Sequence, residues 1–285
     1  MESKAATRRQ LHRLFPSSLV LLGEIVALVV VSLELHPTER GFVEYDATLN
    51  HSYNADSTIP FWVAIVVPLL SLLLTIFGRN RRNLLASIGD IPWVLFFVTA
   101  GVTTAIVTEV VKNLVGRYRP DWLARCLPAD PGAIVIDSFG ATSSENPACT
   151  NTWISQSKLD DGMKSFPSGH SSTAFALGTI VVLYSARWMA TKPSPSPLTM
   201  ALLELWMALQ ISWAFGVATS RVIDNKHHIG DVVAGSMLGV LFGGIYGGRA
   251  WVETDPGPTN PMGALADEAG SSDSADDERY MLQLQ

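Results

Sequence analysis

Six long apolar runs constrain the fold of this chain more than any other feature of its sequence. Each run is close to the ~20 residues that an α-helix needs to cross the hydrocarbon core of a bilayer. Only 16% of the 285 residues are charged, below the roughly 25% of soluble domains, so an ordinary soluble enzyme is excluded. The predicted spans are Leu19 to Leu35, Ile59 to Phe77, Pro92 to Val111, Ser171 to Ala190, Leu198 to Ala218 and Val232 to Trp251.

The sequence therefore predicts an all-α, polytopic integral membrane protein with six transmembrane helices. We expect a cytosolic N-terminal segment at 1–18, a membrane domain at 19–252 and an acidic, disordered cytosolic tail at 253–285. The tail holds eight acids and one base, a charge of −7, so the total of −6 leaves +1 for residues 1–252. Because binding to a nucleic-acid backbone needs clustered Lys and Arg, we expect no nucleic-acid partner.

The first apolar run has two interpretations. Basic residues precede it, as they precede the apolar core of a secretory signal peptide. A cleavable signal ends in a small-residue site after a short core, whereas this run continues to Leu33 and is followed by Glu34, His36 and Glu39. We therefore expect a retained transmembrane helix.

The basic residues of the loops predict the orientation of the spans. Four Lys and Arg residues precede the first span and three Arg residues follow the second, whereas Arg40 is the one base of the first loop. Because cytoplasmic loops carry the excess of Lys and Arg, both termini are expected in the cytosol. The first loop is then lumenal or extracellular, and its sequon at Asn50 is a glycosylation acceptor. We expect an endomembrane (endoplasmic reticulum, Golgi or vacuole) or the plasma membrane.

Both cysteines, Cys126 and Cys149, fall in the loop between the third and fourth spans. The predicted topology puts this loop on the non-cytosolic side, where disulfides persist. We therefore favour a Cys126–Cys149 bridge over two free thiols.

Charged residues beside membrane spans are costly and are usually functional. In this chain they gather in three segments, Lys112 to Pro120, Ser165 to His170 and Ser220 to Asp231. The predicted topology brings all three to one membrane face. We expect one anion site with an acid/base pair, made by Lys112, Arg119, Ser168, Gly169, His170, Arg221, His227 and Asp231.

These residue types suit phosphoryl transfer. Guanidinium groups match phosphate oxygens, and a lysine adds a point charge, so three cations can balance a phosphate and the charge of its transition state. Backbone N–H groups at Ser168 and Gly169, before a helix, would bind the same anion. One histidine can attack phosphorus while the other protonates the leaving oxygen.

We expect His227 rather than its neighbour His228 to be the nucleophile. His227 and Asp231 are spaced i, i+4, so they share a face if the sixth helix starts here, and the carboxylate can then hold the imidazole tautomer. The residue four after His228 is Val232, which cannot orient an imidazole.

Three patterns resemble the signature motifs of the phosphatidic acid phosphatase type 2 superfamily: Lys-x6-Arg-Pro at 112–120, Pro-Ser-Gly-His at 167–170 and Ser-Arg-x5-His-x3-Asp at 220–231. Within it, Arg119 to Cys126 and the doubled histidine look most like lipid phosphate phosphatases and diacylglycerol pyrophosphate phosphatases. The resemblance implies a lipid phosphatase that needs no metal or cofactor and acts at the lumenal or extracellular face.

The resemblance also implies a role for each motif residue. His227 would form a phosphohistidine, Asp231 would orient it, and His170 would be the acid for the leaving group. Phosphate would be bound by Lys112, Arg119, Ser168, Gly169 and Arg221. The implied substrates are phosphatidate, diacylglycerol pyrophosphate and lysophosphatidate, and the sequence does not choose among them or predict an oligomeric state.

Two other classes of protein could use the same residues. A transporter or scaffold would bind a lipid phosphate without hydrolysing it, and release of inorganic phosphate separates it from an enzyme. A metal-dependent hydrolase would use His170, His227 and Asp231 as ligands, but three cations already bring the charge of a metal. We interpret Glu24, Asp90 and Glu109 as interhelical or interfacial hydrogen-bonding residues.

Overall fold

The computed structural model describes most of the predicted membrane domain. The predictions for 1–18 and for the tail from residue 255 fall outside the described residues, whereas residues 253 and 254 are helical. The described residues are 19–40, 42, 46–80, 89–127, 149–191 and 194–254.

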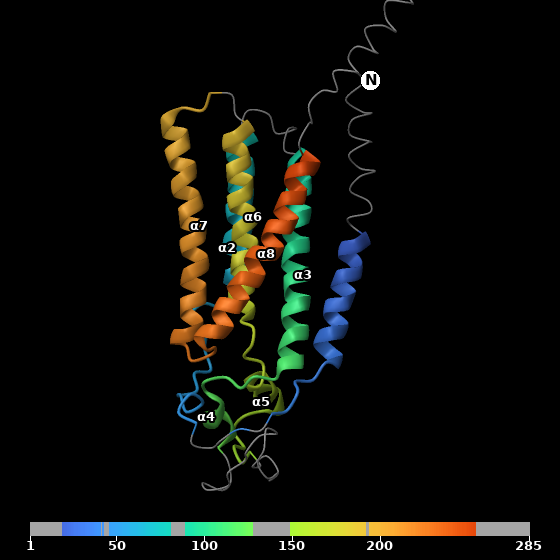
Figure 1. Cartoon of the computed structure of the whole chain (residues 1–285), viewed down its shortest axis with the longest axis vertical. Helices are drawn as coiled ribbons and strands as arrows, with labels where there is room; N and C mark the ends of the chain where they lie inside the picture. Colours follow the sequence, from blue (N-terminus) through green and yellow to red (C-terminus); the bar gives the residue numbers. More distant parts are fainter. Residues whose placement is uncertain are drawn as a thin grey trace, which may run out of the picture.

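Every regular element of the described residues is an α-helix, as the sequence predicts (Figure 1). A helical segment at 19–34 comes first. The helices that follow are α2 (Phe61–Asn80), α3 (Ile91–Val115), α4 (Trp122–Cys126), α5 (Gln156–Gly162), α6 (Gly169–Thr191), α7 (Pro197–Ile223) and α8 (Ile229–Thr254).

Five of these helices, α2, α3, α6, α7 and α8, are long and apolar enough to cross a membrane. They confirm the last five predicted spans. Helix α2 begins at Phe61 rather than Ile59, and at every other end the helices continue past the apolar runs into neighbouring residues. Large apolar side chains such as Leu74, Phe77, Leu205 and Phe215 are exposed on the outside of the bundle, which suits contact with lipid chains. The first predicted span, Leu19 to Leu35, stays a prediction, since the described helix at 19–34 is shorter than the other five.

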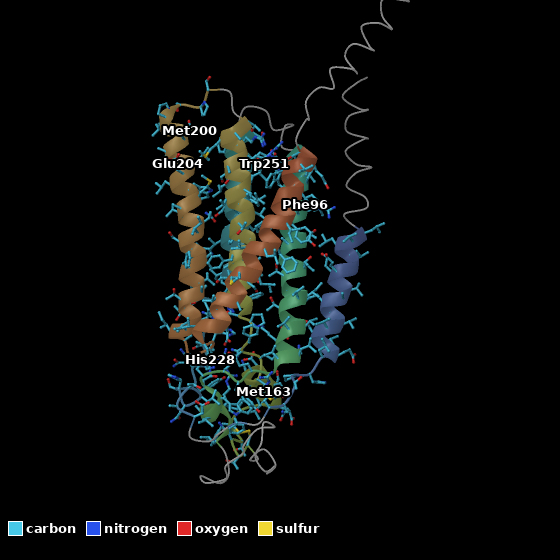
Figure 2. All side chains as sticks on the ribbon, viewed as in Figure 1. Phe96, Met163, Met200, Glu204, His228 and Trp251 are labelled. Atoms are coloured by element: carbon cyan, nitrogen blue, oxygen red, sulfur yellow. A yellow bond between two sulfur atoms is a disulfide. The ribbon has the colours of Figure 1, made fainter. Side chains whose placement is uncertain are left out.

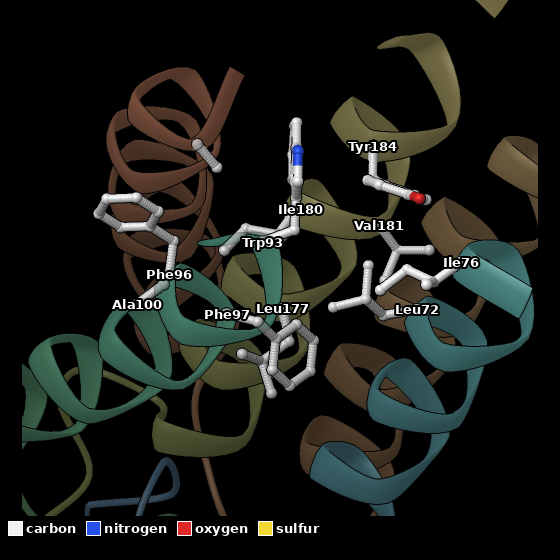
Figure 3. Close-up of a cluster of buried hydrophobic side chains, with 11 residues drawn as sticks. Leu72, Ile76, Trp93, Phe96, Phe97, Ala100, Leu177, Ile180, Val181 and Tyr184 are labelled. Carbon is white, nitrogen blue, oxygen red and sulfur yellow. The ribbon is translucent and has the colours of Figure 1, made fainter. Parts of the chain in front are cut away.

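Helix α6 lies at the centre of the bundle and packs against α2, α3, α7 and α8 (Figure 1). Its buried side chains Leu177, Ile180, Val181 and Tyr184 form a core with aromatic residues of α3, and the Tyr184 ring meets the Trp93 ring edge to face at 5.1 Å (Figure 3). Because α6 is packed on several sides, the residues at its N-terminal end are held in a fixed position relative to the other helices.

A row of glycines lets α8 pack directly on the backbone of α6. Gly235, Gly239 and Gly243 recur at every fourth residue, so they lie on one face of α8. A Cβ atom at these positions would lie 2.5, 2.3 and 2.5 Å from carbonyl oxygens of the facing segment. Only glycine allows this approach, and α6 and α8 are therefore joined closely along their length.

The extramembrane end of the bundle carries α4 and α5. The disulfide Cys126–Cys149 is present, which confirms the predicted bridge. An aromatic cluster with Phe42, Tyr118 and Trp122 fills this end. Figure 2 places His228 and Met163 here and Met200 at the opposite end of the bundle. Asn50 is exposed in the same layer, next to Leu49 and His51, whose backbone groups bond this loop to 120–123.

Candidate active site

A cavity of about 450 Å³ lies where the three polar segments meet. The C-terminal ends of α3 and α7 and the N-terminal ends of α6 and α8 all reach this end of the bundle (Figure 1). Six of the eight predicted site residues line the cavity: Lys112, Arg119, Gly169, His170, Arg221 and His227. The other two, Ser168 and Asp231, are fully buried.

His227 lies in the turn between α7 and α8, only 3% exposed. Its Nδ1 lies 2.7 Å from the backbone carbonyl oxygen of Ser165. Because a carbonyl only accepts, Nδ1 carries the proton, and in the neutral ring Nε2 has a free lone pair. Burial, together with the positive charges of Arg119 and Lys112, holds the pKa of His227 well below 6.5. The imidazole is therefore neutral and held in one tautomer.

Asp231 supports the orientation of His227 indirectly, through contacts with Ser165. Helix α8 begins at Ile229, so the condition for a shared helical face is not met, and the predicted direct orientation of His227 by Asp231 is replaced by another route. One Asp231 oxygen accepts from the Ser165 hydroxyl at 2.6 Å and from the His228 backbone N–H at 3.0 Å. The other accepts from Arg117 at 2.7 Å. Asp231 thus fixes Ser165, and the Ser165 carbonyl fixes His227.

Ser168 also faces α8 rather than the cavity. Its backbone N–H donates to the carbonyl oxygen of Asp231 at 2.9 Å, and its hydroxyl accepts from Ser171 at 3.0 Å. The predicted use of this N–H for an anion is therefore not what the structure has. Gly169 does line the cavity, and a Cβ there would come within 3.2 Å of Lys112 Nζ.

His170 lies in the first turn of α6, on the cavity wall. Its Nε2 lies 3.3 Å from Arg221 Nη1, and its ring meets Phe61 edge to face at 5.1 Å. Because a guanidinium only donates, Nε2 accepts in this pair. The two histidines and Arg221 come from separate segments and face one cavity.

Each of the three predicted phosphate-binding cations has a carboxylate partner. Lys112 pairs with Glu109 at 3.4 Å. Arg119 pairs with Asp161 at 2.7 Å. Arg221 pairs with Asp224 at 2.9 Å. Glu109 and Asp161 line the cavity themselves, so the site combines positive charge with acids that hold its cations in place.

Sequence reasoning missed most of these partners. The sequence predicts Glu109 only as an interhelical or interfacial hydrogen-bonding residue, whereas in the structure it pairs with two lysines, Lys112 and Lys164. Asp224 is three residues after Arg221, a spacing at which helical side chains pair. Asp161 has no such local signal. A further cation, Lys226, lines the cavity and lies 3.8 Å from Asp121, and burial lowers its pKa.

The Nε of Arg119 is a donor that no described residue uses. The side chain is buried, and among the described residues its Nε has no hydrogen-bond partner. A buried N–H without an acceptor is costly, and this Nε is too enclosed for an atom in the cavity to reach it without a shift of the side chain. No group of three or more His, Cys, Asp and Glu side chains is arranged for a metal ion within the placed parts of the chain.

The fold and the site together define a polytopic membrane protein with a cavity lined by cations and two histidines at one end of its helix bundle. A family model described as the PAP2 superfamily matches residues 92–251, more than half of the chain. The chain belongs to the PAP2 superfamily, and it is an integral multi-pass membrane protein.

Several similar proteins align with most of the chain. It is similar to diacylglycerol pyrophosphate phosphatase 1 of Saccharomyces cerevisiae, 30% identical over 262 residues, which are 85% of this chain and 83% of the relative. The probable diacylglycerol pyrophosphate phosphatase 1 of Schizosaccharomyces pombe is 30% identical over 77% of this chain and 75% of its own. Lipid phosphate phosphatase 2 of Arabidopsis thaliana is 31% identical over 78% and 72%. No solved structure gives a significant match.

Proposed function

We propose that this protein is a lipid phosphate phosphatase that works through a phosphohistidine and needs no metal ion. Its substrates are phosphomonoester or pyrophosphate head groups, as in phosphatidate, diacylglycerol pyrophosphate and lysophosphatidate. The observation that carries the proposal is His227, a buried neutral imidazole with Nε2 available, in one cavity with His170 and three cations. The names of the relatives support lipid phosphates as the substrate class.

In the first step His227 Nε2 attacks phosphorus. A P–N bond forms, the bond from phosphorus to the leaving oxygen breaks, and His170 gives a proton to that oxygen. For this step His170 is the imidazolium cation, protonated at the Nε2 that accepts from Arg221 in the structure, so the bound phosphate takes over the Arg221 donor. Arg119, Lys112 and Arg221 stabilise the charge on the phosphoryl oxygens. The proton on Nδ1 of His227 stays in its hydrogen bond to the Ser165 carbonyl, which stabilises the cationic phosphoimidazole.

In the second step water attacks the phosphohistidine. His170, now without its proton, takes one from the water, the P–N bond breaks, and inorganic phosphate leaves with His227 restored. The cavity is also lined by Leu28, Phe61 and Ala105. These apolar side chains suit the start of the acyl chains of a lipid whose head group lies among the cations.

The proposed topology has six spans, both termini in the cytosol and the site at the lumenal or extracellular face, in an endomembrane or the plasma membrane. The exposure of Asn50 in the layer of the site, and the disulfide in that layer, support it. Expression in a eukaryotic host should add a glycan at Asn50. In sealed vesicles whose lumenal face points outward, protease added from outside should cut the Cys126–Cys149 loop. If the loop is protected, the topology is contradicted.

The test of the function is phosphate release from a panel of lipid phosphates in detergent micelles. Tight binding of these lipids without phosphate release would favour a transporter or scaffold instead. Trapped phosphoenzyme is then digested and the phosphopeptide mapped. We expect the label on His227, its loss in His227→Ala and measurable activity in His228→Ala, whereas a label on His228 or His170 would refute the assignment. His170→Ala should slow lipid turnover more than turnover of an activated aryl phosphate, which needs no acid.

A further inference from the structure

Arg119 is held by a helix that lies outside the three sequence motifs. Its Nη2 donates to Asp161 Oδ1 at 2.7 Å. Its backbone N–H donates to the carbonyl oxygen of Gly162 at 2.9 Å. Both acceptors belong to the last turn of α5, so this helix fixes both the backbone and one edge of the guanidinium. The Nε of Arg119 is left buried and without a protein partner among the described residues.

Asp161 is held in turn by Arg125. Its second oxygen accepts from Arg125 Nη1 at 3.2 Å. Arg125 grips the two oxygens of Asp121 through Nε and Nη2 at 2.9 and 3.0 Å, and both side chains are buried. Arg125 Nη1 also donates to the Lys158 carbonyl of α5 at 2.8 Å. This buried, bidentate pair holds Arg125 in one orientation because planar guanidinium and carboxylate groups match in one geometry. Arg125 in turn fixes Asp161.

The negative charge of Asp161 lies between two cations, Arg119 and Arg125, and pairs with both. Although burial acts to raise it, the neighbouring Arg119 and Arg125 hold the pKa of Asp161 below its ordinary value, so the group is a carboxylate at neutral pH. Without that charge, Arg119 and Arg125 would repel each other across the α5 terminus. Arg125 is fixed by Asp121, so Arg119 is the group that would move.

We propose that Asp161 is a positioning residue that holds the Arg119 guanidinium by Nη2 at the wall of the cavity, where the guanidinium donates to a phosphate oxygen. The inference rests on the proposed function, because it assigns Arg119 to the phosphate. Asp161 lines the cavity but acts on the phosphate through Arg119. The structure thus adds α5 to the machinery of the site, with Arg125 and Asp121 as its support.

The test compares Asp161→Asn with Asp160→Asn. Asp160 is the neighbouring carboxylate on the same helix, and it accepts from Gln156 at an exposed position, so it is a matched control. Since misplacing a transition-state contact by ~1 Å can cost on the order of 100-fold, D161N should lower kcat about 10- to 100-fold. The KM for lipid in micelles should change less than about 3-fold, and D160N should stay within about 2-fold of the parent.

A double-mutant cycle with Arg119→Lys separates positioning from a general effect. If Asp161 works through Arg119, D161N should add less than about 3-fold to the loss already caused by R119K. An equal loss in both backgrounds, or a D161N variant with parental kcat, would overturn the inference. Absence of phosphate release by the parent protein would instead refute the proposed function, so the two failures are distinguishable.

Folding is checked by thermal unfolding in detergent. The Asp161 side chain is 44% exposed, so D161N should still fold, with a Tm only slightly below that of the parent. If it does not, Asp161→Glu decides, because glutamate keeps the charge between the two guanidinium groups. Recovery of kcat in D161E supports positioning, and a folded D161E variant as slow as D161N overturns it.

Discussion

Adding one methyl group to α8 should disable the site with little effect on stability. In Gly235→Ala, the new Cβ atom would lie 2.5 Å from the Ser168 carbonyl oxygen and 3.2 Å from the Ser168 nitrogen. Both are backbone atoms, which cannot rotate away. Ordinary contact begins at 3.4 Å, so the two segments must separate by about 0.9 Å, which is 3.4 minus 2.5.

The expected magnitudes follow from this displacement. Overpacking of this kind costs about 1–3 kcal/mol, and alanine returns about 1 kcal/mol of helix propensity relative to glycine. Net destabilisation is then about 0–2 kcal/mol. The shift, however, moves His170 away from His227, and a displacement of ~1 Å at reacting groups costs on the order of 100-fold in rate. Activity should therefore fall far more than stability.

The assay measures kcat for phosphate release and Tm in detergent for three variants. Gly244→Ala is the matched control, because nothing lies within 4 Å of its new Cβ. Gly247→Ala meets the flexible end of Leu183 at 2.5 Å, far along α8 from the site, so it tests helix packing without the motif. A G235A variant with more than half of the parental kcat, or an equal loss in G247A, would refute the reasoning.

Three further predictions concern the chemistry and the loop. The pKa of His227 is held well below 6.5, so the proposed nucleophile stays neutral as the pH falls through that value. Phosphoenzyme formation, measured by rapid quench, should therefore persist to about one pH unit below 6.5. A decline centred on pH 6.5 would contradict this. Phosphate release should survive excess EDTA, since cations supply the charge, and a loss restored by Mg²⁺ or Zn²⁺ would reject the mechanism. Cys126 and Cys149 should resist alkylation until reduced, and reduction should destabilise their loop by roughly 3 kcal/mol, read as faster proteolysis; an unchanged cleavage rate would count against it.

The membrane helices and the membership of the site were open to prediction from sequence. A run of about 20 apolar residues has few alternatives to a span, and five of the six runs are helices of spanning length. Three separated motifs could be assigned to one face because the number of crossings fixes their side. The helix ends were less predictable, since residues such as Lys112 and Asn113 are polar yet remain in α3.

The supports of the site could not be derived from local patterns. The spacing of His227 and Asp231 predicts a direct contact only if both lie in one helix, and α8 begins two residues after His227. Asp161 reaches Arg119 across 42 positions of chain. Such a contact depends on how α5 docks, and docking is a property of tertiary packing rather than of sequence period.

The hydrogen bond from His227 to the Ser165 backbone carbonyl affects which substitutions at position 165 the protein can tolerate. A carbonyl belongs to every amino acid, so no substitution at position 165 deletes the acceptor that fixes the imidazole tautomer. Substitution there instead removes the hydroxyl that donates to Asp231. The acceptor of the proposed nucleophile therefore survives such a change, and the orientation of the imidazole depends on whether the backbone at this buried position keeps its path.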